Sequence, residues 1–214
     1  GNTWDVRVTD NTNNDLLYAL QSSLASSGSA NSTRNLNAAS GWGGSSYTTT
    51  RAAAPFAILA PIYETLQIFE ASTTDRNFPP ANFGWSVNNR PGGNDISSGL
   101  IGTSSYRGNG QIVILGSENT DTDEYDEHIV VHEWGHYFED QLSRSDSIGG
   151  QHGGADRLDM RVAMGEGWGN ALSGIGTGDP IYKDSLNDKQ SQGFAFSVEG
   201  NSYTNTGWFN EGSV

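Results

Sequence analysis

The ten residues from Ile129 to Phe138, IVVHEWGHYF, constrain this chain more than any other segment. His132 and His136 are four positions apart, so on an α-helix both side chains project from one face, one turn apart. Two imidazole nitrogens can then approach one metal ion at the distance of about 2.0–2.1 Å that zinc prefers. Glu133 lies beside the first histidine, placed to reach a metal-bound water rather than the metal itself. The segment therefore predicts a helix that carries a zinc site.

The surroundings of the two histidines support this interpretation. Apolar and aromatic residues flank them, so no charge interrupts the helix around the ligands, as a buried metal site requires. The alternative is an amphipathic helix whose histidines have this spacing by chance. The chain has only 4 His, and two of them enclose a glutamate here, which favours zinc.

A third ligand must come from elsewhere in the chain. A third histidine six positions after His136 would complete one extended zinc pattern, but Leu142 stands there. Glu166 lies in the stretch MGEGWGNAL, which we predict to be a second helix that begins near Asp156. Its glycines lower helix propensity, so we expect them to permit close packing on the first helix, which would bring the carboxylate to the zinc. The alternatives are an exposed Glu166 in an irregular turn, and Asp179 as the ligand.

Two motifs together, HEWGH (132–136) and GEGWGN (165–170), resemble the gluzincin metallopeptidases, the group of thermolysin and fungalysin. The resemblance implies a zincin-like catalytic domain that hydrolyses peptide bonds, with zinc held by His132, His136 and Glu166. It also implies that Glu133 acts as general base. Asn170 stands where thermolysin-like enzymes carry an aspartate that supports the first histidine, so the resemblance is to the wider group and not to the thermolysin family proper.

The segment GTGDPIYK (176–183) is similar to the aspzincin signature, in which the aspartate binds zinc and the tyrosine stabilises the transition state. It departs at Lys183, where that signature has glycine, and Thr-Gly-Asp-Pro is also an ordinary turn. We favour Glu166 over Asp179 because it belongs to the combined pattern. Transition-state stabilisation calls for a tyrosine or histidine, and the sequence does not choose between Tyr182, Tyr203 and His152.

The two remaining histidines have plainer interpretations. His128, His132 and His136 would span about 12 Å along a helix, too far for one zinc ion, so we expect His128 to be a polar residue near the helix end rather than a ligand. His152 lies in the Gly-rich run GGQHGG, where a solvent-exposed loop histidine is the ordinary case.

Composition limits the partners. The net charge is −14 and the only lysines are Lys183 and Lys189, which excludes nucleic acid and anionic membrane surfaces. No apolar run approaches the length of about twenty residues that spans a membrane. There is no cysteine, and Gly, Ser, Thr and Asn are abundant, as is typical of bacterial extracellular proteins. We expect a secreted protein that acts on a peptide or protein substrate. Nothing indicates its oligomeric state.

The pattern of elements predicts an α+β fold and a single catalytic domain over residues 1–214, with an N-terminal sheet-containing lobe followed by the two site helices. We predict strands at 1–8 and 111–115, helices at 15–24 and 52–71, and a loop-rich stretch over 72–110. The gluzincin resemblance implies that strand 111–115 is a sheet edge along which substrate binds, the alternative being a buried strand. The segment 208–214, with Asn210 as a possible helix cap, suggests a fragment of a longer polypeptide.

An acidic segment, residues 118–127, carries six carboxylates in ten positions. Ca²⁺ could bind several such oxygens, but the EF-hand pattern is not met. We favour carboxylates that stabilise the positive end of the metal-binding helix, with Asp123 or Asp126 as its cap.

The alternative function is a non-catalytic secreted surface or glycan-binding module, with structural zinc or none, for which the 6 Trp would suit. A general base at Glu133 argues against it, because structural zinc sites have no use for one.

Overall fold

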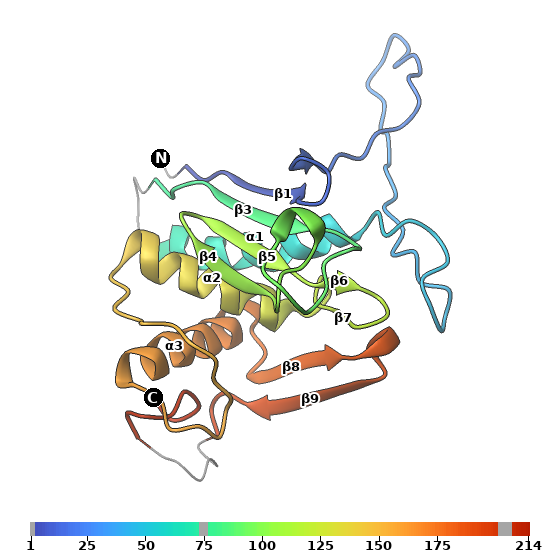
Figure 1. Ribbon diagram of the computed structural model, residues 1–214. Coiled ribbons are helices and arrows are strands. Elements are labelled where there is room, and N and C mark those ends of the chain that lie inside the picture. The colour runs from blue at the N-terminus through green and yellow to red at the C-terminus, as the bar shows by residue number, and fades with distance from the viewer. Residues whose placement is uncertain (1–2, 73–76, 201–206) are drawn as a thin grey trace.

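The computed structural model describes residues 3–72, 77–200 and 207–214. Its main sheet has five strands in the order β2-β1-β3-β5-β4 (Figure 1). The three inner strands are parallel, and the outer strands β2 and β4 are antiparallel to their neighbours. Their bounds are Val6–Asp10 for β1, Leu16–Leu17 for β2, Ala81–Trp85 for β3, Ser105–Gly108 for β4 and Gln111–Ile114 for β5. The described residues also form three α-helices, so the fold is mixed α+β, as expected.

Helix α1 (Ala54–Ser72) connects β1 to β3, because parallel neighbours need a crossover connection. Ile58, Ile62 and Leu66 recur every four residues, so they share one face, and all three are buried against the sheet. The predicted core helix at 52–71 is therefore confirmed, and its Pro55 stands in the first turn, where proline is tolerated.

Helix α2 (Glu127–Leu142) carries the two histidines and lies between the sheet and helix α3 (Met160–Thr177), which carries Glu166. Figure 1 shows the sheet above α2 and α3 below it. Helix α3 begins later than the expected start near Asp156. Asp159 is its cap, since that side chain accepts a hydrogen bond from the backbone N–H of Arg161.

Glycines allow α2 and α3 to approach closely, as the sequence predicted. A Cβ atom on Gly135 would lie 3.2 Å from Cα of Gly169, and a Cβ atom on Gly169 would lie 2.8 Å from two atoms of the His132 ring. The indole N–H of Trp168 donates across this interface to the carbonyl of Gly135, at 3.0 Å. The lower helix propensity of Gly169 is therefore offset by close contact with α2.

The remaining strands form two small ribbons. Strands β6 (Gly116–Ser117) and β7 (Asp121–Thr122) pair just before α2. Strands β8 (Ile181–Leu186) and β9 (Gln192–Ser197) form a hairpin after α3, seen below the main sheet in Figure 1. Short 3₁₀ turns lie at Ile96–Ser98 and Asp188–Gln190.

One sequence-based prediction about the elements is wrong. Residues 15–24 do not form a helix: Asn14 and Asp15 have positive φ angles of 53°, and this turn sends β2 back along β1. The described part of the predicted loop-rich stretch 72–110 is mostly loop, as expected, and it also holds the short strands β3 and β4. The polar and glycine residues of these short strands hid the usual alternation.

Strand 111–115 is correctly placed as β5 but is not a sheet edge. It lies between β3 and β4, and Ile112, Val113 and Ile114 are fully buried. The buried alternative therefore holds, and β4 is the outer strand on that side.

The segment near the C-terminus is built of turns rather than the entry to a helix. Asn210 is buried, and its side-chain amide donates to the carbonyls of Gly154 and Asp156. This asparagine therefore anchors the loop before α3 instead of capping a helix.

Candidate metal centre

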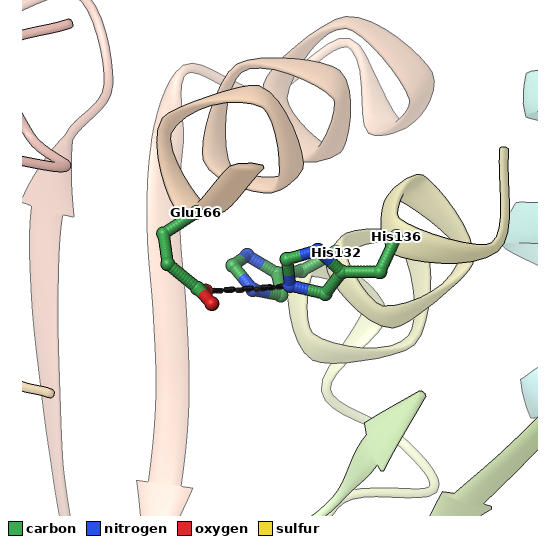
Figure 2. Close-up of side chains that lie close together, drawn as sticks. All are labelled: His132, His136 and Glu166. Carbon is green, nitrogen blue, oxygen red and sulfur yellow. Dashed lines mark hydrogen bonds and ion pairs between the residues drawn. The ribbon is translucent and has the colours of Figure 1, made fainter. Parts of the chain in front are cut away.

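The side chains of His132, His136 and Glu166 converge between α2 and α3 (Figure 2). The two Nε2 atoms lie 3.1 Å apart. Oε2 of Glu166 lies 3.1 Å from Nε2 of His132 and 3.3 Å from Nε2 of His136. The structure thus brings together the three residues that the sequence singled out from two separate helices.

These separations fit a zinc ion. Ligand atoms about 2.0–2.1 Å from a tetrahedral zinc are roughly 3.3–3.4 Å from one another, close to the three values found here. Nδ1 of His132 lies 3.1 Å from the amide oxygen of Asn170, which can only accept, so Nδ1 carries the proton. Nε2 of His132 then presents a lone pair to a carboxylate oxygen and a second imidazole. A cation bound among the three atoms satisfies this arrangement.

The electrostatics of the cluster favour an ionised Glu166. Burial opposes ionisation, but the imidazole rings of His132, His136 and His152 that face the carboxylate outweigh it and hold the pKa of Glu166 well below its usual range. Burial also opposes a charge on His136, yet its hydrogen bond with Glu166 and the charge of Glu133 raise its pKa. Glu166 is therefore the negatively charged group that this cluster offers to a cation.

Glu133 lies beside this centre without belonging to the ligand cluster. Its Oε2 accepts a hydrogen bond of 2.7 Å from the backbone N–H of Tyr106 in β4. Oε1 has no partner among the described residues. Glu133, His132, His136 and Glu166 all line one open cleft of about 1700 Å³. The cleft is bounded by β4, α2, α3, the loop between the helices and the β8–β9 hairpin.

Asp179 does not join the two histidines. Its carboxylate pairs with Lys183 at 2.6 Å and accepts the backbone N–H of Ile181, so it closes a turn at the start of β8. The ring of His128 is buried and its Nε2 donates to the carbonyl of Asp179 at 3.0 Å. The structure therefore places Glu166, and neither of these residues, at the centre.

The candidates for a transition-state donor differ in position. Tyr182 is buried on the cleft wall, with its ring centroid 6.2 Å from that of His132. Burial raises the pKa of its hydroxyl well above the usual value, so the hydroxyl keeps its proton. Tyr203 lies outside the described residues.

His152 is not the free surface histidine that the sequence suggested. Its Nε2 lies 3.1 Å from Oε1 of Glu166 and its Nδ1 lies 2.8 Å from Glu211. Hydrogen bonds to these two carboxylates raise its pKa to about 10. Its ring therefore carries positive charge beside the centre. No pattern around Glu211 could have identified that partner from the sequence.

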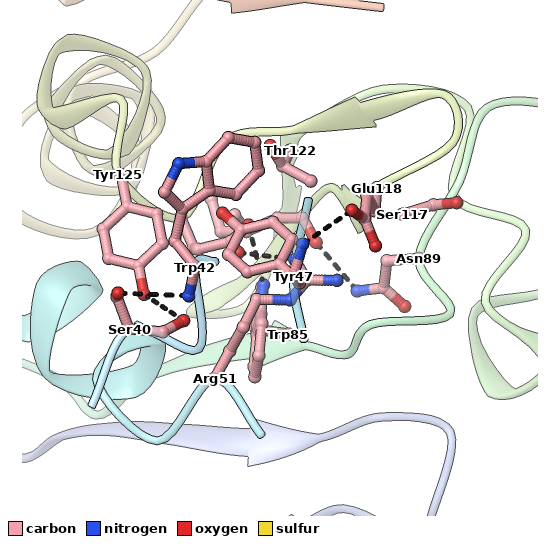
Figure 3. A network of polar contacts seen from close by, with 12 residues as sticks. Ser40, Trp42, Tyr47, Arg51, Trp85, Asn89, Ser117, Glu118, Thr122 and Tyr125 are labelled. Carbon is pink, nitrogen blue, oxygen red and sulfur yellow. Dashed lines mark hydrogen bonds and ion pairs between the residues drawn. The ribbon is translucent and has the colours of Figure 1, made fainter. Parts of the chain in front are cut away.

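The six carboxylates of the acidic segment have different roles. Glu118 accepts the backbone N–H of Tyr47 at 2.8 Å, in the network of Figure 3. Glu124 forms a buried ion pair of 2.6 Å with Arg51. Asp126 stands at the cap position of α2, but its carboxylate binds Ser185 of β8 instead of the helix N–H groups. The sequence-based prediction that a side chain of this segment caps α2 is therefore wrong.

Two further members of the segment, Asp121 and Asp123, meet Asp184 of β8. Each of the three offers a carboxylate oxygen within 4.8 Å of the other two, and all three residues line the cleft. Burial raises the pKa of Asp121 to about 6 and, with the charges of Asp126 and Asp121, that of Asp184 to about 7. The sequence did not single out Asp184. Its place two residues after Tyr182 on a strand was the available signal, because alternate residues share a face.

The tryptophans do not gather on a binding face. Trp85 and Trp134 are buried in the core, and Trp168 packs against it. None of the tryptophans in the described residues lines the cleft. This arrangement does not support glycan contact at the cleft.

No helix of the described part of the chain combines the length and the apolar character that a membrane span needs. Comparisons of the chain with protein-family models, curated proteins and solved structures gave no match.

Proposed function

We propose that this protein is a secreted, zinc-dependent endopeptidase whose catalytic domain is zincin-like and related to the gluzincins. One observation carries the proposal. Two imidazole nitrogens and a carboxylate oxygen, all 3.1–3.3 Å apart, lie in an open cleft beside a glutamate that is not one of the three ligands. A structural zinc site is normally closed by four protein ligands, whereas a catalytic site keeps one position open to the solvent.

His132, His136 and Glu166 would hold the zinc, and Asn170 would orient His132 through Nδ1. Zinc bound there would act as a Lewis acid on a carbonyl and lower the pKa of a water molecule to about 7. Glu133 would accept the proton of that water at Oε1 and deliver it to the nitrogen of the leaving amine. The Tyr106 N–H fixes the other carboxylate oxygen and so limits the rotation of Glu133.

Two polar side chains that line the cleft carry protons near the metal cluster. Tyr182 keeps its phenolic proton, and His152 is held as a cation between two glutamates. Tyr182 would stabilise negative charge on oxygen by donating a hydrogen bond and His152 by its positive charge, and such stabilisation makes a large contribution in a desolvated site.

The cleft also suits an extended peptide. Strand β4 is an outer strand of the main sheet and lines the cleft. An extended substrate can therefore pair with β4, rather than with the buried β5 as expected from the sequence. Carboxylates at the cleft, with the net charge of −14, favour cationic peptides.

The test combines metal content with cleavage. Zinc is measured by elemental analysis after dialysis, and cleavage of a mixture of unstructured peptides is followed by mass spectrometry. We expect about one zinc per chain in the wild type. Glu133→Gln should keep the zinc and cut the rate by at least about 10²-fold. Glu166→Gln should lose the zinc. Asp179→Asn removes one carboxylate outside the cluster and is the matched control. It should keep both the zinc and the cleavage activity.

A wild-type protein without zinc contradicts the proposal. Zinc without cleavage points instead to the non-catalytic surface module with structural zinc. Loss of zinc in Asp179→Asn but not in Glu166→Gln would transfer the third ligand to the aspartate.

A further inference from the structure

A second group of acidic side chains lies in the same cleft, outside the ligand cluster of the zinc. Asp121 lies in β7 and Asp123 directly follows it, so their side chains share one face of an extended segment. Asp184 approaches them from β8, which is distant in sequence. Their three nearest carboxylate oxygens all lie within 4.8 Å of one another.

These carboxylates have oxygens without partners. Oδ1 of each is buried and receives no hydrogen bond from any residue that the structure describes. Asp123 is the clearest case, because only 4% of its surface is exposed. Ser104 donates a hydrogen bond to its Oδ2, whereas its Oδ1 accepts none from the described residues. None of the three forms an ion pair with a described lysine, arginine or histidine. Buried, unpaired carboxylate oxygens are costly, so three together call for a cation.

We propose that Asp121, Asp123 and Asp184 bind a calcium ion at the wall of the cleft. Ca²⁺ takes six to eight oxygen ligands at 2.3–2.6 Å, so oxygens on opposite sides of one ion are about 4.6–5.2 Å apart. The separations found here fall within that limit. The open cleft gives water molecules access to the remaining ligand positions.

The ligand types select among cations. Zinc prefers nitrogen and sulfur ligands, which this cluster does not offer. Magnesium usually keeps several waters and binds one or two carboxylates. The ammonium group of a substrate lysine is the remaining competitor. The near-complete burial of Asp123 favours a small ion over a side chain that would have to enter from the cleft.

The calcium would join β7 to β8 and thereby fix the cleft wall. Tyr182 and Asp184 are alternate residues of β8 and both line the cleft, and the Tyr182 ring lies against that of His132. Holding Asp184 would therefore hold Tyr182 at the zinc centre. This last consequence rests on the proposed peptidase function, but the calcium site itself does not.

The test measures calcium binding directly, by isothermal titration calorimetry on full-length protein that has been stripped of metal and reloaded with one equivalent of zinc. Peptide cleavage is not the readout, so an inactive protein can still support the calcium site. We expect one calcium per chain and a rise of the melting temperature by about 5–10 °C at a hundredfold excess over Kd. Asp184→Asn and Asp121→Asn should each weaken binding by at least about tenfold.

Asp188→Asn is the matched control, because Asp188 lies in the turn of the same hairpin with its carboxylate exposed. It should bind calcium as the wild type does. Without calcium, Asp184→Asn should melt at a higher temperature than the wild type, since it removes a repelling charge. With calcium, the order should reverse. This reversal cannot come from a variant that merely folds poorly.

Several results overturn the proposal. It is overturned if folded wild type releases no heat with calcium, if Asp188→Asn loses binding as Asp184→Asn does, or if magnesium competes at equal concentration. If calcium does not bind and Asp184→Asn no longer cleaves lysine-containing peptides, the cluster binds a substrate side chain instead.

Discussion

Gly169→Ala is the sharpest test of how the two helices build the proposed zinc site. Its Cβ atom would lie 2.8 Å from Cε1 and Nδ1 of His132 and 3.0 Å from Cγ. Real Cβ contacts do not occur at such distances, so the ring must move. The ring is held on one edge by Asn170 and faces Glu166 on the other, so any shift changes the ligand geometry.

The expected magnitude follows from two opposing effects. Alanine improves helix propensity by about 1 kcal/mol over glycine. Forcing a methyl group into a packed interface costs about 1–3 kcal/mol. When His132 is bound to zinc, it cannot rotate away without loss of a ligand bond, so we expect most of this cost in the zinc affinity. Zinc binding should weaken about 5- to 150-fold, because about 1.4 kcal/mol corresponds to tenfold.

Gly165→Ala is the control on the same helix. Its Cβ would lie 3.2 Å from Oε2 of Glu139, the far end of a side chain that can shift. Zinc affinity is measured by competition with a chromophoric chelator, and the stability of the metal-free proteins by thermal unfolding. Gly165→Ala should bind zinc as the wild type does and melt at the same temperature or slightly higher. Equal zinc affinities for the two alanine variants would refute the reasoning about the helix contact.

Three further predictions concern single groups. Asn170→Ala should weaken zinc binding about 10- to 100-fold in the same competition assay, whereas Asn170→Asp should bind more tightly than the alanine variant, because a charged acceptor raises ligand basicity. Arg51→Ala should lower the free energy of unfolding in urea by about 3–5 kcal/mol, since it leaves Glu124 buried and unpaired; adding Glu124→Gln should recover part of the loss. In calcium-free solution the folded protein has a pKa of about 6 at Asp121 and about 7 at Asp184. Both values exceed the unfolded value of about 3.9. The two groups therefore stabilise the fold fully below about pH 4, and this stabilisation is lost as the pH rises towards 7. Urea unfolding at pH 5 and pH 7.5 measures this loss, and saturating calcium should abolish it.

The candidate metal site was predictable where the pattern is local. The spacing of His132 and His136 places both on one helical face whatever the rest of the chain does, because the α-helical repeat fixes the direction of side chains. The glycines beside Glu166 had no local use, which pointed to a close helix contact. The structure supplies that contact at Gly135 and Gly169.

The errors arose where distant segments meet. Strand 111–115 has the same sequence whether it is a sheet edge or an inner strand, and only its pairing with β4 decides between them. The sequence predicts that Asp126 caps the helix, but its carboxylate instead accepts a hydrogen bond from Ser185, which is distant in the chain. The sequence around His152 predicts an exposed loop histidine, but in the fold its two ring nitrogens contact Glu166 and Glu211.

The sequence by itself determined the two site helices and the chemistry of their side chains, since helix periodicity and residue type are local properties. Only the tertiary structure decided which carboxylate joins the histidines and that Asp121, Asp123 and Asp184 meet. It also decided which strand borders the cleft. The reason is that contacts between distant segments depend on how whole elements pack, and no short stretch of sequence encodes that packing.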